Sequence, residues 1–299
     1  MAKIPVGKTI SYAYSFTFGN FLTVVGLAWF PLLLVGIGAY LALPPYFAGL
    51  QAMMATQDPT KLSSAGGYML LFMIVMFMSF NMIYVAVARQ ALGLRTGPAF
   101  FYFSLDRAFW RLLGAYLLMF LIVMGVMIAG GIVFGVLAGI LVATVGQGVA
   151  AGAAGVTGAV VLVGLTFFLM FRLLFFMAPV TVAEGHRVLR RSWTLSGGNF
   201  WRIFAVLLAI MVPLIIVEIV LEVVIFGFVS LGPLRPNASP QETIAFYQQI
   251  GAQLYGMLPF LAPVAIVLYA VVIGLLISAS SFAYRALVPA TEGVAAEFA

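Results

Sequence analysis

The stretch IFAVLLAIMVPLIIVEIVLEVVIFGFVSL, residues 203–231, decides the fold class. Its only charged side chains are Glu218 and Glu222, and it exceeds the about 20 apolar residues that span a hydrocarbon core of about 30 Å as a helix. The chain of 299 residues shares this bias, with 65% hydrophobic residues, 7% charged residues and a mean hydropathy of +1.19. A water-soluble globule could not bury so many apolar side chains. The sequence therefore predicts an all-α integral membrane protein.

Five further runs are long enough to cross a membrane, so we expect six transmembrane helices within one transmembrane domain, residues 1–299. The six runs cover residues 20–43, 68–88, 112–143, 156–180, 203–231 and 257–289. We expect Pro44 and Pro45 to stop the first run and Pro213 to interrupt the fifth, because proline lacks a backbone donor and clashes with the preceding helical turn.

The basic residues are distributed unevenly among the segments between these runs. If the N-terminus is cytoplasmic, the inner segments hold most of the 14 lysines and arginines, namely Lys3, Lys8, Arg89, Arg95, Arg107, Arg111, Arg187, Arg190, Arg191, Arg202 and Arg285. The outer loops then hold only Lys61 and Arg235. Because cytoplasmic loops are enriched in lysine and arginine, we predict that both termini are cytoplasmic in a multi-pass protein of the bacterial inner membrane.

A short motif occurs twice and predicts an internal repeat. Phe-Trp-Arg occupies residues 109–111 and again residues 200–202, and the Gly-Asn-Phe of residues 198–200 also occurs at residues 19–21. Each copy directly precedes an odd-numbered run. We therefore expect three helical hairpins, with pseudo-repeats at about residues 1–95, 96–182 and 183–299.

An amphipathic segment precedes each Phe-Trp-Arg, most clearly at residues 182–195. There Glu184, Arg187 and Arg191 share one face, and Val182, Leu189 and Trp193 share another. We expect short helices in the cytoplasmic interface, with their arginines among anionic headgroups. One interpretation is that the motifs only anchor the chain, and the other is that they form a lipid-headgroup site. The candidate headgroup contacts are Trp110, Arg111, Arg187, Arg190, Arg191, Trp201 and Arg202.

The segment RLLFFMAPVTVAEGHRVLRRSWTLSGGNFWRIF, residues 172–204, and the closing AYRALVP, residues 283–289, carry a family resemblance. The chain resembles uncharacterised bacterial six-span proteins related to the membrane domain of glycerophosphoryl diester phosphodiesterases. The resemblance implies the fold and little chemistry, because the Glu, Asp and His cluster of the soluble catalytic barrel in that family has no counterpart in this sequence.

Ionisable side chains within the spans are candidates for a functional site, since burying a charge in a membrane is costly. Arg172 lies in the fourth run, Glu218 and Glu222 share a helix face in the fifth, and Asn81 lies in the second. They form either a polar cavity between hairpins or a structural Arg172–Glu218 pair with additional helix-to-helix hydrogen bonds.

Gly131, Gly135 and Gly139 recur every four residues and give the third run a smooth face for another helix. This face predicts internal packing, a homo-oligomer or a membrane-protein partner. The chain has no cysteine and one histidine, His186, so we expect no metal site and no cofactor.

The sequence supplies no pairing of nucleophile and base, so we expect no catalytic residues and no enzyme. We predict a non-enzymatic membrane protein that organises or handles lipid, or serves as an accessory subunit, with anionic lipids as partners and no nucleic acid. The alternative is a small-molecule or proton-coupled transporter, because internal repeats and midplane charges are common in transporters.

Overall fold

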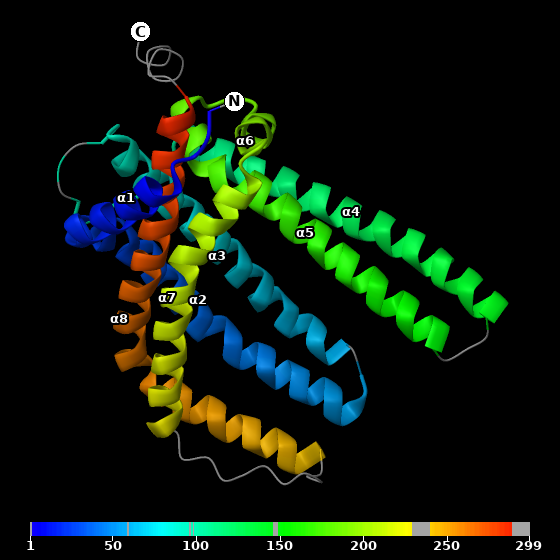
Figure 1. Cartoon of the computed structure of the whole chain (residues 1–299). Helices are drawn as coiled ribbons and strands as arrows, with labels where there is room; N and C mark the ends of the chain where they lie inside the picture. Colours follow the sequence, from blue (N-terminus) through cyan, green and yellow to red (C-terminus); the bar gives the residue numbers. More distant parts are fainter. Residues whose placement is uncertain are drawn as a thin grey trace. The chain divides into compact units, whose positions relative to one another are not determined.

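The computed structural model describes residues 2–58, 60–95, 97, 99–145, 149–228 and 240–288 (Figure 1). Helices dominate these residues, and no β-strand occurs among them, so the predicted all-α class is confirmed. The helices are α1 (Val6–Gly19), α2 (Phe21–Thr56), α3 (Thr60–Leu92), α4 (Arg107–Val145), α5 (Val149–Ala183), α6 (Val188–Ser196), α7 (Phe200–Phe228) and α8 (Pro240–Leu287).

Six of the helices contain segments that are long and apolar enough to cross a membrane, with mean hydropathies between 2.2 and 3.0. These segments are Phe21–Met53, Gly66–Leu92, Arg107–Thr144, Gly155–Ala183, Phe200–Ile225 and Tyr255–Leu287. The predicted number of spans is confirmed. By length and composition the chain is a multi-pass membrane protein.

The prolines do not divide the helices as the sequence predicted. Helix α2 continues through Pro44 and Pro45 to Thr56, and α7 runs through Pro213 without a break. A proline inside a helix loses one backbone hydrogen bond, whereas a helix end in hydrocarbon would leave several groups unsatisfied. Continuation is therefore the less costly arrangement for an apolar run.

The chain divides into two compact units, each assembled from separate segments. Among the described residues, the first unit contains residues 2–9, 105–206 and 279–288, and the second contains residues 10–104 and 207–278. These units combine segments that are distant in the sequence, whereas the three predicted pseudo-repeats are consecutive segments. The pseudo-repeats stay a prediction.

In the second unit, α2 packs along α3, and the core includes Phe16, Leu27, Ile83 and Ile273, which come from α1, α2, α3 and α8. Gly26 lets the backbone that follows α3 approach α2, since a Cβ at this position would overlap the carbonyl group of Ala99. Such close packing stabilises the unit through van der Waals contacts, because lipid is as apolar as the side chains and supplies no hydrophobic driving force between helices.

The segment between α3 and α4 differs from its prediction. Residues 93–95, 97 and 99–106 form no separate helix, so the expected interfacial helix before the first Phe-Trp-Arg, residues 109–111, is wrong. Gly93, with φ of 74°, ends α3 in the left-handed conformation that favours glycine. The aromatic run that follows packs on α2 instead, where Phe101 lies 4.7 Å from Phe30 and the Trp29 indole donates to the Phe100 carbonyl oxygen at 2.6 Å.

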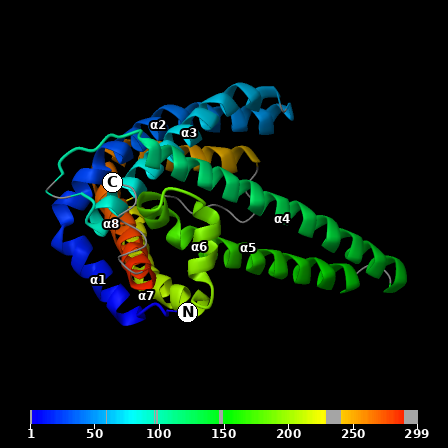
Figure 2. The same ribbon diagram turned by 90° about the horizontal axis from the view of Figure 1, so that it is seen from above.

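In the first unit, α4 and α5 lie side by side along their length (Figures 1 and 2). The close approach involves Gly158, where a Cβ would lie 3.0 Å from the Phe134 ring, and Gly130, where it would overlap Leu162. The short helix α6 packs on α5. These three helices position the candidate site.

Candidate functional site

The site is built on α6, which follows directly from the end of α5. The chain turns at Gly185, with φ of 69°, and at Arg187, with φ of 49°, before α6 begins. Val188, Ser192 and Ser196 form the buried face of α6, while Arg190, Trp193 and Thr194 are exposed. The predicted amphipathic helix is therefore confirmed as an element.

Its detail differs from the prediction. Val182 lies in the last turn of α5, which ends at Ala183, and residues 184–187 form a turn, so the two faces assigned to residues 182–195 are wrong. Trp193 is exposed at the helix surface and not on the buried face. The glycine at position 185 breaks the periodicity, because a positive φ interrupts a right-handed helix.

Arg172 of α5 holds the C-terminal end of α6. Its Nη2 donates to the carbonyl oxygen of Trp193 at 2.9 Å, and its Nε donates to Oγ of Ser196 at 3.3 Å. The guanidinium carbon lies 3.6 Å from the centre of a Trp193 ring, within the range of a cation–π contact. A cation at the C-terminal end of a helix also opposes the negative end of the helix dipole. We call this group the arginine clamp.

Glu184 holds the first turn of α6 to α8. Its Oε1 accepts hydrogen bonds from Nε of Arg191 at 2.8 Å and from the Tyr284 hydroxyl at 2.9 Å. The carboxylate side chain is 13% exposed and the arginine side chain 32%, so the ion pair is partly shielded from water. The two ends of α6 are thus fixed to two different spans of the same unit.

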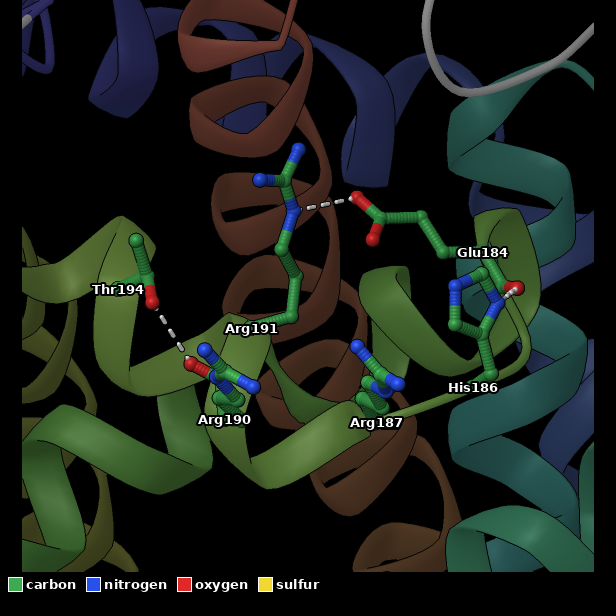
Figure 3. A pocket seen from close by; sticks show the side chains of 6 residues that line it. All are labelled: Glu184, His186, Arg187, Arg190, Arg191 and Thr194. Atoms are coloured by element: carbon green, nitrogen blue, oxygen red, sulfur yellow. Dashed lines mark hydrogen bonds and ion pairs between the residues drawn. The ribbon is translucent and has the colours of Figure 1, made fainter.

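A hollow of about 250 Å³ opens beside this surface helix (Figure 3). It is lined by Glu184, His186, Arg187, Arg190, Arg191 and Thr194. Figure 3 shows Arg191 reaching toward Glu184, while Arg187 and Arg190 extend from the helix separately. Within the described part of the chain, neither Arg187 nor Arg190 has an ion-pair partner. Among the described residues, the hollow therefore carries an excess of positive charge.

The second Phe-Trp-Arg has a structural role that sequence analysis missed. Oδ1 of Asn199 accepts a hydrogen bond from the Ile4 backbone N–H at 3.1 Å, and Arg202 donates to the Ile4 carbonyl oxygen at 2.8 Å. Arg202 is thus engaged with the N-terminal segment, whereas Trp201 is 75% exposed and Trp110 is also exposed. In this motif, Arg202 binds the N-terminal segment and Trp201 exposes its indole ring at the surface.

Helix α1, which follows this attachment, was also missed. Its buried positions Thr9, Ala13, Phe16 and Thr17 have the spacing of one helix face. This buried face contains small and polar side chains, so its hydropathy is lower than that of the neighbouring spans. The spacing alone could have identified the helix.

The first copy of the motif begins α4. The carboxylate of Asp106 accepts a hydrogen bond from the Phe109 N–H at 3.1 Å, which satisfies a backbone donor at the start of the helix. Arg111 is exposed one residue after Trp110. The headgroup assignments for these two side chains stay a prediction.

The candidate intramembrane residues lie in different units. Arg172 belongs to the first unit, and Glu218, Glu222 and Asn81 belong to the second, so the predicted pairing of Arg172 with Glu218 stays a prediction. Both glutamates are exposed, whereas Asn81 is buried and donates to the Phe77 carbonyl oxygen at 2.9 Å. The sequence did not indicate that Arg172 would contact α6.

The glycine face of α4 points away from α5. A Cβ at Gly131, Gly135 or Gly139 would meet no other atom within 4 Å, in contrast to Gly130 and Gly158. These three glycines therefore do not contact α5, and internal packing against another helix stays a prediction. A contact with another protein through this face stays a prediction.

No group of three His, Cys, Asp or Glu side chains among the described residues could hold a metal ion. Comparisons of the chain with protein-family models, with curated proteins and with solved structures found no match. The relation to the membrane domain of glycerophosphoryl diester phosphodiesterases stays a prediction.

Proposed function

We propose that this protein is a non-enzymatic multi-pass protein of the bacterial inner membrane that organises or handles anionic lipid at the cytoplasmic face. The observation that carries the proposal is the hollow beside α6, where Arg187 and Arg190 are exposed and have no ion-pair partner in the described residues. Unpaired arginines on a surface helix next to membrane spans match the chemistry of phosphate headgroups.

The topology forms part of the same proposal. Three helical hairpins with both termini in the cytoplasm would bring α6 to the cytoplasmic leaflet, and the distribution of basic residues supports this orientation. The exposed indoles of Trp110 and Trp201 fit the headgroup region, where amphipathic rings are enriched. In this topology, the cations and indoles would lie at the depth of the anionic headgroups.

Attachment of α6 at both ends supports a binding role. The arginine clamp and the Glu184–Arg191–Tyr284 contacts fix the helix before any ligand arrives. A helix that is already held in place presents its arginines to an anion with a smaller loss of backbone conformational entropy than a mobile segment would. Near an anionic membrane surface each arginine contributes about 1 kcal/mol, so Arg187 and Arg190 together contribute about 2 kcal/mol.

The experiment is native mass spectrometry of the full chain purified in detergent, comparing retained phosphatidylglycerol with retained phosphatidylethanolamine. We expect the Arg187→Gln/Arg190→Gln variant to lose the anionic lipid. The matched control is Lys8→Gln/Arg107→Gln, which also removes two exposed cations but leaves the hollow intact. Equal retention of anionic lipid by all three proteins would overturn the proposal.

A further inference from the structure

The charges that line the hollow leave a defined excess. Three arginines and one glutamate face it, and the ion pair at 2.8 Å assigns Glu184 to Arg191. The Tyr284 hydroxyl, which donates to the same carboxylate oxygen at 2.9 Å, holds Glu184 in place. The Glu184 carboxylate therefore neutralises Arg191. The guanidinium groups of Arg187 and Arg190 contribute two further positive charges that no carboxylate in the described residues balances.

The backbone supports this reading of Arg187. It adopts a φ of 49°, a left-handed conformation that costs an arginine energy and costs glycine almost none. Arg187 is also the residue before the first turn of α6, where a side chain that accepts hydrogen bonds is usual. A guanidinium group has no acceptor. The position thus carries a strained residue that cannot cap the helix, which fits a side chain used for binding.

The size and lining of the hollow fit a phosphate group that is contacted by several side chains. Its volume of about 250 Å³ leaves room for a phosphate group. Arginine binds phosphate through paired N–H donors, so two guanidinium groups suit several terminal oxygens. His186 also lines the hollow, and its Nδ1 lies 2.7 Å from the Glu184 carbonyl oxygen.

We infer that the hollow beside α6 binds a terminal phosphate monoester, carried by a lipid headgroup, in preference to the phosphate diester of common phospholipids. A phosphate monoester carries a charge of about −1.5 to −2 at neutral pH and has three terminal oxygens. A diester carries a single charge and has two ester links that block the approach of donors. The two guanidinium groups that have no ion-pair partner among the described residues balance the charge of the monoester and exceed that of the diester. The inference rests on the proposed function and specifies its ligand.

The test uses the full chain in detergent micelles, titrated with phosphatidate, whose headgroup is a monoester, and with phosphatidylglycerol of the same acyl chains. Native mass spectrometry counts the bound lipids. We expect the wild type to prefer phosphatidate by about fivefold or more, one additional headgroup charge contributing about that factor near arginine. The Arg187→Gln/Arg190→Gln variant should bind phosphatidate about 30-fold more weakly, and the Lys8→Gln/Arg107→Gln control should match the wild type.

A soluble competitor, glycerol 3-phosphate, distinguishes the two sources of a phosphate monoester. Competition only at concentrations far above that of phosphatidate supports the lipid source. Competition at equal concentration keeps the monoester chemistry but overturns the assignment to a lipid.

The remaining outcomes separate this inference from the proposed function. If phosphatidate and phosphatidylglycerol bind equally and both depend on Arg187 and Arg190, the monoester inference is overturned and the anionic-lipid function stands. If neither lipid depends on these arginines, both fail. Because the two side chains are exposed and make no ion pair in the described residues, we expect the variant to fold. An unchanged melting temperature checks this.

Discussion

Breaking the arginine clamp should release α6 from α5 by an amount that can be worked from the structure. Arg172→Met removes the hydrogen bond to the Trp193 carbonyl oxygen at 2.9 Å and the cation–π contact at 3.6 Å. A hydrogen bond from a charged group contributes about 1.5 to 3 kcal/mol, and an exposed cation–π contact about 0.5 to 1 kcal/mol. Their sum is at least about 2 kcal/mol, which corresponds to a change of about 30-fold in an opening equilibrium.

The assay measures how often the buried face of α6 opens. The chain contains no cysteine, so Ser192→Cys introduces a single thiol at a fully buried position. A thiol that reacts only in the open state is labelled at a rate proportional to the opening equilibrium. In this background, Arg172→Met should raise the rate of maleimide labelling about 30-fold. Arg172→Lys, which keeps the charge but not the paired donors, should give an intermediate rate.

Two controls make the result specific to the clamp. Arg107→Met removes an exposed arginine of α4 and should leave the labelling rate unchanged. A thiol at the buried Ser79 of α3 reports opening elsewhere, and its rate should not respond to Arg172→Met. Equal labelling of Ser192→Cys with and without Arg172→Met would refute the reasoning that Arg172 holds α6 in place.

Three other variants follow from the same structure. Glu184→Gln keeps an acceptor for Tyr284 but loses the ion pair with Arg191, so the free energy of unfolding should fall by about 1 to 2 kcal/mol. An unchanged denaturation midpoint in detergent would count against the attachment of α6 to α8 through Glu184. Asn199→Ala removes the acceptor of the Ile4 N–H, so trypsin should cut the N-terminal lysines faster, and an unchanged rate would contradict that attachment. Gly158→Leu should destabilise the α4–α5 pair by about 1 to 3 kcal/mol, because the position faces the Phe134 ring, whereas Gly131→Leu should have little effect. Equal effects would show that the wrong face of α4 has been assigned to α5.

The sequence predicted the all-α class and the number of spans because apolar length alone determines what can span a membrane. It failed at Pro44, Pro45 and Pro213, because the cost of ending a helix in hydrocarbon is a property of the environment and not of the residue. Local propensity rules developed for water therefore placed breaks where the helices continue.

The candidate site was predicted in part. The arginines of α6 were identified from their spacing, yet the Arg172 clamp joins residues 172 and 193, and no helical period links positions so far apart on two different helices. The Glu184–Tyr284 contact spans 100 residues and was equally beyond a local pattern. The role of Asn199 was hidden for the same reason, since its partner Ile4 lies at the other end of the chain.

The central claim, that α6 faces the cytoplasm, is tested most directly by single-cysteine labelling in a chain that has no cysteine of its own. Thr194→Cys places a thiol on the exposed face of α6, and Ser63→Cys places one between the first two spans. With a membrane-impermeant maleimide on spheroplasts, we predict labelling of Ser63→Cys at once and of Thr194→Cys only after permeabilisation. Labelling of Thr194→Cys in intact spheroplasts would contradict the account.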